Sequence, residues 1–118
     1  MEKKVSKEQM SQLPYIIAVD FDGTLVEDKF PEIGEIRTTV WKELTERMKV
    51  YGTRVILWTS RDHDNLKAAV QFCADHGLHF DAINANLDEV QVLFNNDTRK
   101  VYADEYWDDK ARSRFCVD

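Results

Sequence analysis

Cysteine is scarce in this chain of 118 residues, and no long apolar run is present. The two cysteines, Cys73 and Cys116, are too few for a disulfide framework, which indicates a reducing compartment. No stretch approaches the ~20 apolar residues that a membrane-spanning helix needs. Residues 1–14 form a polar arm that lacks the apolar segment of an export signal. We therefore expect a cytoplasmic protein with no membrane segment.

A basic excess is also missing, since the formal net charge is -6 at pH 7. This balance argues against a general nucleic-acid binder, which usually carries a positive surface. The apolar fraction of 43% is enough for the core of one ordinary domain. The sequence thus predicts two parts, the polar arm at 1–14 and one folded domain at 15–118.

Strand-like and helix-like segments alternate along this domain. Short apolar runs predict strands at 15–21, 54–58, 80–84 and 101–107. Apolar residues at near-helical spacing predict helices at 36–51 and 63–76, and Gly52 and Gly77 stand where each should end. The stretch 86–99 allows a further short helix. The alternation predicts an α/β fold, a three-layer α/β/α sandwich around a Rossmann-like parallel sheet.

Reactive polar side chains follow three of the four predicted strands. They are Asp20 and Asp22, then Thr59 and Ser60, then Asp108 and Asp109. In an open parallel sheet, ligands bind beyond the carboxyl ends of the strands, where the strand order reverses. Two acids two residues apart point to the same side, and they are costly together unless a cation or a proton separates them. This convergence predicts a metal-dependent phosphoryl-transfer site.

The motifs and their order resemble the haloacid dehalogenase (HAD) superfamily of phosphohydrolases. The most specific match is residues 20–25, Asp-Phe-Asp-Gly-Thr-Leu. Residues 57–60, Leu-Trp-Thr-Ser, and the segment 101–109 with its closing acid pair match moderately. The resemblance covers about residues 15–112. It implies a Mg²⁺-dependent phosphomonoester hydrolase with a HAD-like fold.

The resemblance also implies roles for the four acids. Asp20 would be the nucleophile that forms an aspartyl-phosphate, and Asp22 would be the general acid and then the general base. The Mg²⁺ ligands would be Asp20, the main-chain carbonyl of Asp22, and Asp108, with Asp109 as a second or water-mediated ligand. The dehalogenases of the superfamily lack the second Asp, so Asp22 favours a phosphatase.

Further residues are assigned to the phosphate and the substrate. Thr59 would donate a hydrogen bond to a phosphoryl oxygen, and Lys100, with Lys110 as the fallback, would add positive charge. Gly23 would let the backbone turn so that N–H groups face the phosphate. Arg61 would bind a second phosphate or a carboxylate of the substrate. The substrate-binding set is Gly23, Thr24, Ser60 and Arg61.

The connections are too short for the cap domain that covers the site in many HAD enzymes. Only about a dozen residues separate Thr24 from the first predicted helix of the domain, too few to fold as a domain. The chain is therefore similar to the small, capless (C0-type) subgroup, and the site should be open. An open site implies a large substrate, low selectivity, or a cover supplied by another subunit of a homo-oligomer. Small metabolites, nucleic-acid ends and phosphoproteins all remain candidate substrates.

Two alternatives from other functional classes stay open. One is a HAD-fold protein that binds a ligand without turnover. The other is a receiver-type signalling domain, which also arranges acids, Thr or Ser, and Lys around Mg²⁺. A receiver carries its phosphoacceptor at the end of the third strand, where this chain has Asn84.

Overall fold

The fold comes from a computed structural model, which describes residues 5–94, 101–108 and 112–113. One sheet holds five strands in the order β3-β2-β1-β4-β5. The strands are β1 (Tyr15–Val19), β2 (Thr53–Leu57), β3 (Ala82–Ile83), β4 (Glu105–Trp107) and β5 (Arg112–Ser113). The helices are α1 (Lys7–Met10), α2 (Thr38–Met48), α3 (His63–Asp75) and α4 (Asp88–Phe94). None of these helices is long and apolar enough to cross a membrane.

The central strand β1 pairs in parallel with β2 on one side and with β4 on the other. Because Val19 stands opposite both Leu57 and Trp107, the residues that follow these three strands meet at one edge of the sheet. The chain moves outward from β1 to β2 and β3, and then returns to the other side of β1 with β4. The strand order therefore reverses beside β1, where open α/β sheets bind their ligands.

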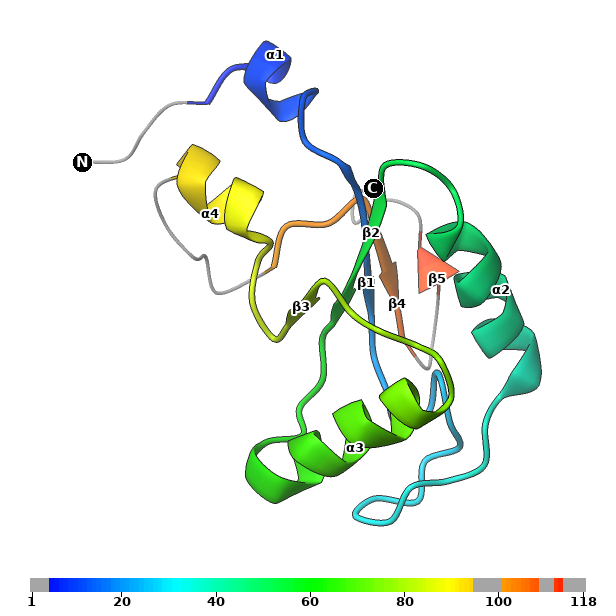
Figure 1. Ribbon diagram of the computed structural model, residues 1–118. Helices are drawn as coiled ribbons and strands as arrows, with labels where there is room; N and C mark the ends of the chain where they lie inside the picture. The colour runs from blue at the N-terminus through cyan, green and yellow to red at the C-terminus, as the bar shows by residue number, and fades with distance from the viewer. Residues whose placement is uncertain (1–4, 95–100, 109–111, 114–118) are drawn as a thin grey trace.

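Side chains of β1 alternate between two apolar layers, as the period of a strand requires. Ile17 and Val19 belong to the layer that includes residues of α2 and α3. Ile16 and Ala18 belong to the layer that includes Val90 of α4. Figure 1 shows α2 and α3 on one side of the sheet and α4 on the other. This arrangement confirms the predicted α/β fold with a mainly parallel sheet.

The helix predictions agree with the structure apart from the ends. The range 36–51 contains α2, and 63–76 contains α3. Gly52 and Gly77 follow these helices with φ of 87° and 82°, the left-handed conformation that glycine adopts at little cost. The ambiguous stretch 86–99 contains α4.

Strand β4 is shorter than the predicted range 101–107, although Val101 is buried. The main-chain N–H of Tyr102 donates to the side chain of Asn86, at 2.6 Å. The N–H of Ala103 donates to the hydroxyl of Tyr106, at 3.1 Å. Because side chains accept hydrogen bonds from these two N–H groups, the groups do not extend the pairing of β4 with β1.

The buried side chain of Glu105 in β4 forms hydrogen bonds that connect β4 to β1 and to α2. Glu105, only 4% exposed, accepts hydrogen bonds from Tyr15 Oη at 2.5 Å and from Trp107 Nε1 at 2.9 Å. Arg47 at the end of α2 donates to both carboxylate oxygens. Burial alone would raise the pKa of Glu105, but the hydrogen bonds from Arg47, Tyr15 and Trp107 outweigh it and lower the pKa to about 2. The ionised carboxylate is thus stabilised in the folded state.

The first prediction concerns this carboxylate. In Glu105→Gln we expect the free energy of unfolding at pH 7 to fall by about 3 kcal/mol, because the lowered pKa corresponds to a contribution of that order. A depressed pKa contributes stability above the unfolded value of 4.5, and this contribution is lost as the pH falls toward 2. The difference in free energy of unfolding between the wild type and Glu105→Gln, measured by urea titration, should therefore shrink as the pH falls from 4.5 to 2.

Glu89→Gln is the matched control, because Glu89 pairs with Arg54 at 2.7 Å but both side chains are about 40% exposed. An exposed pair of this kind contributes only about 0–1 kcal/mol. The role assigned to Glu105 would be contradicted if both variants lost the same free energy of unfolding. It would also be contradicted if the difference between wild type and Glu105→Gln did not depend on pH.

Candidate active site

Asp20 lies where the strand order reverses, directly after β1. Its main-chain N–H donates to Trp107 O of β4 at 2.9 Å, which continues the pairing of β1 and β4 past the last strand residue. Its Oδ1 accepts from the N–H of Phe21 at 2.7 Å. Asp108 follows Trp107 and is exposed. The register therefore brings Asp20 and Asp108 to neighbouring strand ends, as the sequence predicted.

The turn after Asp20 is closed by hydrogen bonds within itself. Phe21 O accepts from the N–H groups of Thr24 and Val26, and the N–H of Gly23 donates to Val26 O at 2.8 Å. Gly23 has φ of 83°, so the glycine is needed for the turn, as predicted. The turn differs from the prediction in one respect. The N–H groups of Gly23 and Thr24 are used inside the turn and do not face a phosphate.

The hydroxyl of Thr24 is a buried polar group inside this turn. Thr24 is 2% exposed, and its Oγ1 has no hydrogen-bond partner among the described residues. Most buried side-chain polar atoms are paired, so this hydroxyl is available to a water molecule or a ligand atom. If Thr24 binds a substrate, as the sequence predicted, its side-chain hydroxyl is the group with a free hydrogen-bonding capacity.

Thr59 follows β2 and is held in place from two directions. Its N–H donates to Asn84 Oδ1 at 2.8 Å, and its Oγ1 accepts from the N–H of Arg61 at 3.2 Å. An oxygen that accepts here keeps its own proton for another acceptor, which fits the predicted bond to a phosphoryl oxygen. Ser60 is exposed next to it.

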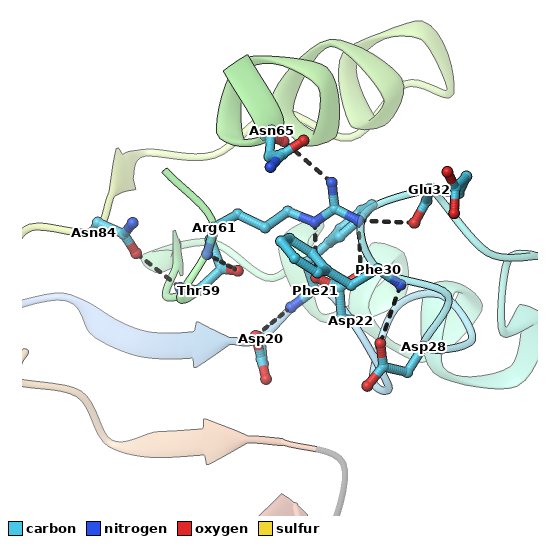
Figure 2. Close-up of polar contacts among 10 residues, drawn as sticks. All are labelled: Asp20, Phe21, Asp22, Asp28, Phe30, Glu32, Thr59, Arg61, Asn65 and Asn84. Carbon is cyan, nitrogen blue, oxygen red and sulfur yellow. Dashed lines mark hydrogen bonds and ion pairs between the residues drawn. The ribbon is translucent and has the colours of Figure 1, made fainter. Parts of the chain in front are cut away.

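Asp22 forms a two-point ion pair with Arg61, shown in Figure 2. Arg61 Nε donates to Asp22 Oδ2 at 2.7 Å, and Arg61 Nη2 donates to Asp22 Oδ1 at 2.8 Å. The Arg61 side chain is fully buried and that of Asp22 is 15% exposed. The hydrogen bonds with Asp22 raise the pKa of Arg61 against the opposing effect of burial, so the guanidinium stays charged.

Two further segments, the one that holds Phe30 and Glu32 and the start of α3, also contact the guanidinium of Arg61. Its Nη2 also donates to Glu32 O at 3.0 Å, and its Nη1 donates to Asn65 O of α3 at 3.2 Å. The rings of Phe21 and Phe30 each lie 5.1 Å from its central carbon. The substrate-binding role predicted for Arg61 does not fit this geometry, because the guanidinium is buried and bound to the protein itself.

The segment 27–35, which we call the flap, connects the turn after β1 to the approach to α2. Glu27 N donates to Glu35 O at 2.8 Å, and Val26 and Ile36 form an antiparallel bridge, so the two ends of the flap lie together. Within the flap, Phe30 is 54% exposed although its ring packs on Arg61. The described connection between β1 and α2 is therefore a loop with no separate folded domain inserted in it.

Two of the predicted Mg²⁺ ligands lie at one edge of the sheet. Asp20 and Asp108 bring two carboxylates to one edge, and the main-chain carbonyl of Asp22 is close in sequence. Asp109 and Lys100 lie outside the described residues, as does Lys110. The described residues hold no cluster of three or more acid, His or Cys side chains suited to a metal. Mg²⁺ usually binds one or two carboxylates and keeps several waters, so the oxygen donors present fit this ion.

Asn84 is a site residue whose role the sequence left undecided. It has φ of 51°, a left-handed conformation that Asn tolerates better than most residues, and its N–H donates to Leu57 O at 2.7 Å. This conformation follows β3 and turns its side chain toward Thr59 (Figure 2). An Asn at the end of the predicted strand 80–84 was the available signal, but turn chemistry explained it equally well.

The second prediction concerns Asn84. We expect Asn84→Ala to lower the free energy of unfolding by about 1–3 kcal/mol. The substitution removes the acceptor for Thr59 N–H, and Ala tolerates a left-handed conformation less well than Asn does. Asn84→Gly should be more stable than Asn84→Ala, since only the acceptor is lost. Amide hydrogen exchange at Thr59 should accelerate in both variants and stay slow in Asn84→Asp. Slow exchange at Thr59 in the Ala and Gly variants would contradict the assignment.

Comparisons with known proteins give one relative. No protein-family model matches the chain, and no curated protein matches it either. A solved structure, described as that of a conserved protein from Bacteroides thetaiotaomicron, matches with 37% sequence identity and a TM-score of 0.67. The match covers 83% of this chain and 78% of that protein.

Proposed function

The chain belongs to the same family as this conserved Bacteroides protein, and we propose that it is a Mg²⁺-dependent phosphomonoester hydrolase of the HAD type. The observation that carries the proposal is the meeting of three strand ends. Asp20 after β1 stands between Thr59 after β2 and Asp108 after β4. A nucleophile, a hydrogen-bond donor and a second carboxylate at one edge are the parts that phosphoryl transfer to a carboxylate needs.

The proposed reaction has two steps. A carboxylate oxygen of Asp20 bonds to phosphorus while the bond to the leaving oxygen breaks, and Asp22 gives its proton to that oxygen. A water molecule then attacks the aspartyl-phosphate, Asp22 takes a proton from this water, and the bond between phosphorus and Asp20 breaks. Inorganic phosphate leaves, and both acids return to their starting states.

The remaining residues would support charge and geometry. Bound Mg²⁺ would offset the repulsion between a carboxylate and a phosphate dianion, held by Asp20, Asp108 and the carbonyl of Asp22 with help from Asp109. Thr59 would hold a phosphoryl oxygen through its hydroxyl proton, and Lys100 would add positive charge there. Thr24 Oγ1, which is buried and without a described partner, is a further donor for the bound phosphate.

One observation favours the alternative of a HAD-fold protein that binds without turnover. The general acid must carry a proton, whereas both oxygens of Asp22 accept from Arg61 in this structure. A carboxylate in that arrangement is the form expected after proton donation. Turnover measurements therefore decide between the two functions.

The receiver-type alternative is less favoured, because the residue after β3 is Asn84, and it binds Thr59 N–H.

The third prediction tests the nucleophile and the metal together. We expect the wild type to hydrolyse p-nitrophenyl phosphate with Mg²⁺ and to lose activity with EDTA. Asp20→Asn should lower kcat by about 10³-fold or more, because an amide cannot form the acyl-phosphate. Asp75→Asn, an exposed Asp→Asn change at the end of α3, is the control and should retain activity.

Full activity in Asp20→Asn, or turnover that does not respond to EDTA, would contradict the proposed mechanism. Mg²⁺ binding by calorimetry without turnover on aryl phosphates, sugar phosphates, phosphorylated nucleic-acid ends or phosphopeptides would instead favour the binding-only alternative.

We place the proposed enzyme in the cytoplasm, since Cys73 is a free, buried thiol.

A further inference from the structure

The guanidinium of Arg61 is almost saturated by the protein. Four of its five N–H groups donate to protein oxygens, two of them to Asp22 and one each to Glu32 O and Asn65 O. The side chain has no exposed surface. A substrate phosphate would have to displace one of these contacts to reach it. Arg61 therefore acts on the chemistry only through a residue that it touches.

The residue it touches most closely is Asp22. Two parallel N–H···O contacts fix both the position and the plane of a carboxylate, which one contact would leave free to rotate. The rings of Phe21 and Phe30 cover the guanidinium and keep water from competing for these contacts. The Asp22 side chain itself remains 15% exposed, so it can still meet a substrate.

We propose, on the premise of the proposed function, that Arg61 is a positioning residue that aims Asp22 at the leaving oxygen. As the bond between phosphorus and the leaving oxygen breaks, the proton moves from Asp22 to that oxygen, and the carboxylate left behind is the one that Arg61 binds at two points. The flap supports this contact through Phe30 and the carbonyl of Glu32. After the first step, the ionised Asp22 carboxylate would be bound at two points by Arg61, which is the arrangement in this structure.

The leaving group separates this role from a structural one. A nitrophenolate is stable enough to depart without a proton, whereas an alkoxide is not. If Arg61 aims the general acid, its loss should matter greatly for alkyl phosphates and little for nitrophenyl phosphate. A residue needed only for folding would affect all phosphomonoesters to the same degree.

The experiment measures kcat for p-nitrophenyl, phenyl and ethyl phosphate with wild type, Arg61→Gln, Asp22→Asn and the double variant. We expect Arg61→Gln to lower kcat about 100-fold or more on ethyl phosphate, as for loss of general acid catalysis, and less than about 3-fold on p-nitrophenyl phosphate. Asp22→Asn should show the same pattern. The double variant should be no worse than Asp22→Asn, because the two residues act as a unit.

Arg61→Lys tests the two-point contact, because it keeps the charge but cannot reproduce the planar fork. It should stay defective on ethyl phosphate. Full recovery in Arg61→Lys would mean that charge alone suffices, and it would overturn the orientation role. Equal losses on all three substrates in Arg61→Gln, or additive losses in the double variant, would overturn it too.

Phe30→Ala keeps the test available if the Arg61 variants do not fold. Phe30 lies on the flap and is 54% exposed, so its removal spares the core while it uncovers the guanidinium. We expect a smaller loss, about 5-fold to 20-fold on ethyl phosphate, with the same dependence on the leaving group. Tyr51→Ala, a fully exposed aromatic residue at the turn before β2, is the control.

The outcomes for the two proposals are distinct. A wild type that hydrolyses none of the three substrates overturns the proposed function and this inference together. A wild type that needs Asp20 and Mg²⁺, combined with Arg61 and Phe30 variants whose losses ignore the leaving group, overturns this inference alone.

Discussion

The ion pair of Asp22 and Arg61 connects the parts of the chain that form the edge of the site. Asp22 belongs to the turn after β1, Arg61 to the segment between β2 and α3, and the same guanidinium binds carbonyls of the flap and of α3. A buried guanidinium is stable only when its charge is paired and its donors are satisfied. The fold meets this demand by bringing three segments, the turn after β1, the flap and α3, to the side chain of Arg61. The shape of the proposed site depends on this contact.

A second arginine–carboxylate contact lies away from this edge. Arg47 and Glu105 join α2 to β4, and Tyr15 adds the first residue of β1. Between the two contacts, β1 is apolar and buried from Ile16 to Val19. The strand that delivers Asp20 is therefore held by packing along its length and by charged contacts near both ends. Such support would suit the nucleophilic role proposed for Asp20, because the position of a nucleophile must be kept within a fraction of an ångström.

The flap packs on one side of Arg61 at the edge of the proposed site. Its ends are joined by the contact of Glu27 with Glu35, while Phe30 lies over Arg61. A cap domain would select substrates by enclosing them. Here the flap packs on Arg61 beside Asp22, so under the proposed function the selection of a substrate would fall to the surface around the site or to a partner. Such a division would suit the proposed phosphatase if its substrates are large or varied.

Local patterns in the sequence determined the fold class and the edge at which the polar residues gather. Apolar runs predicted β1, β2 and the end of β4, and apolar spacing with Gly52 and Gly77 predicted α2 and α3, because these features depend on neighbours in the chain. The tertiary structure alone decided where Arg61 points and what Asn84 does. Arg61 meets Asp22 at a separation of 39 residues and Glu32 at 29, and Asn84 meets Thr59 at 25. An arginine after a strand can reach a substrate or turn inward, and only the packing of distant segments around it makes the inward contact favourable.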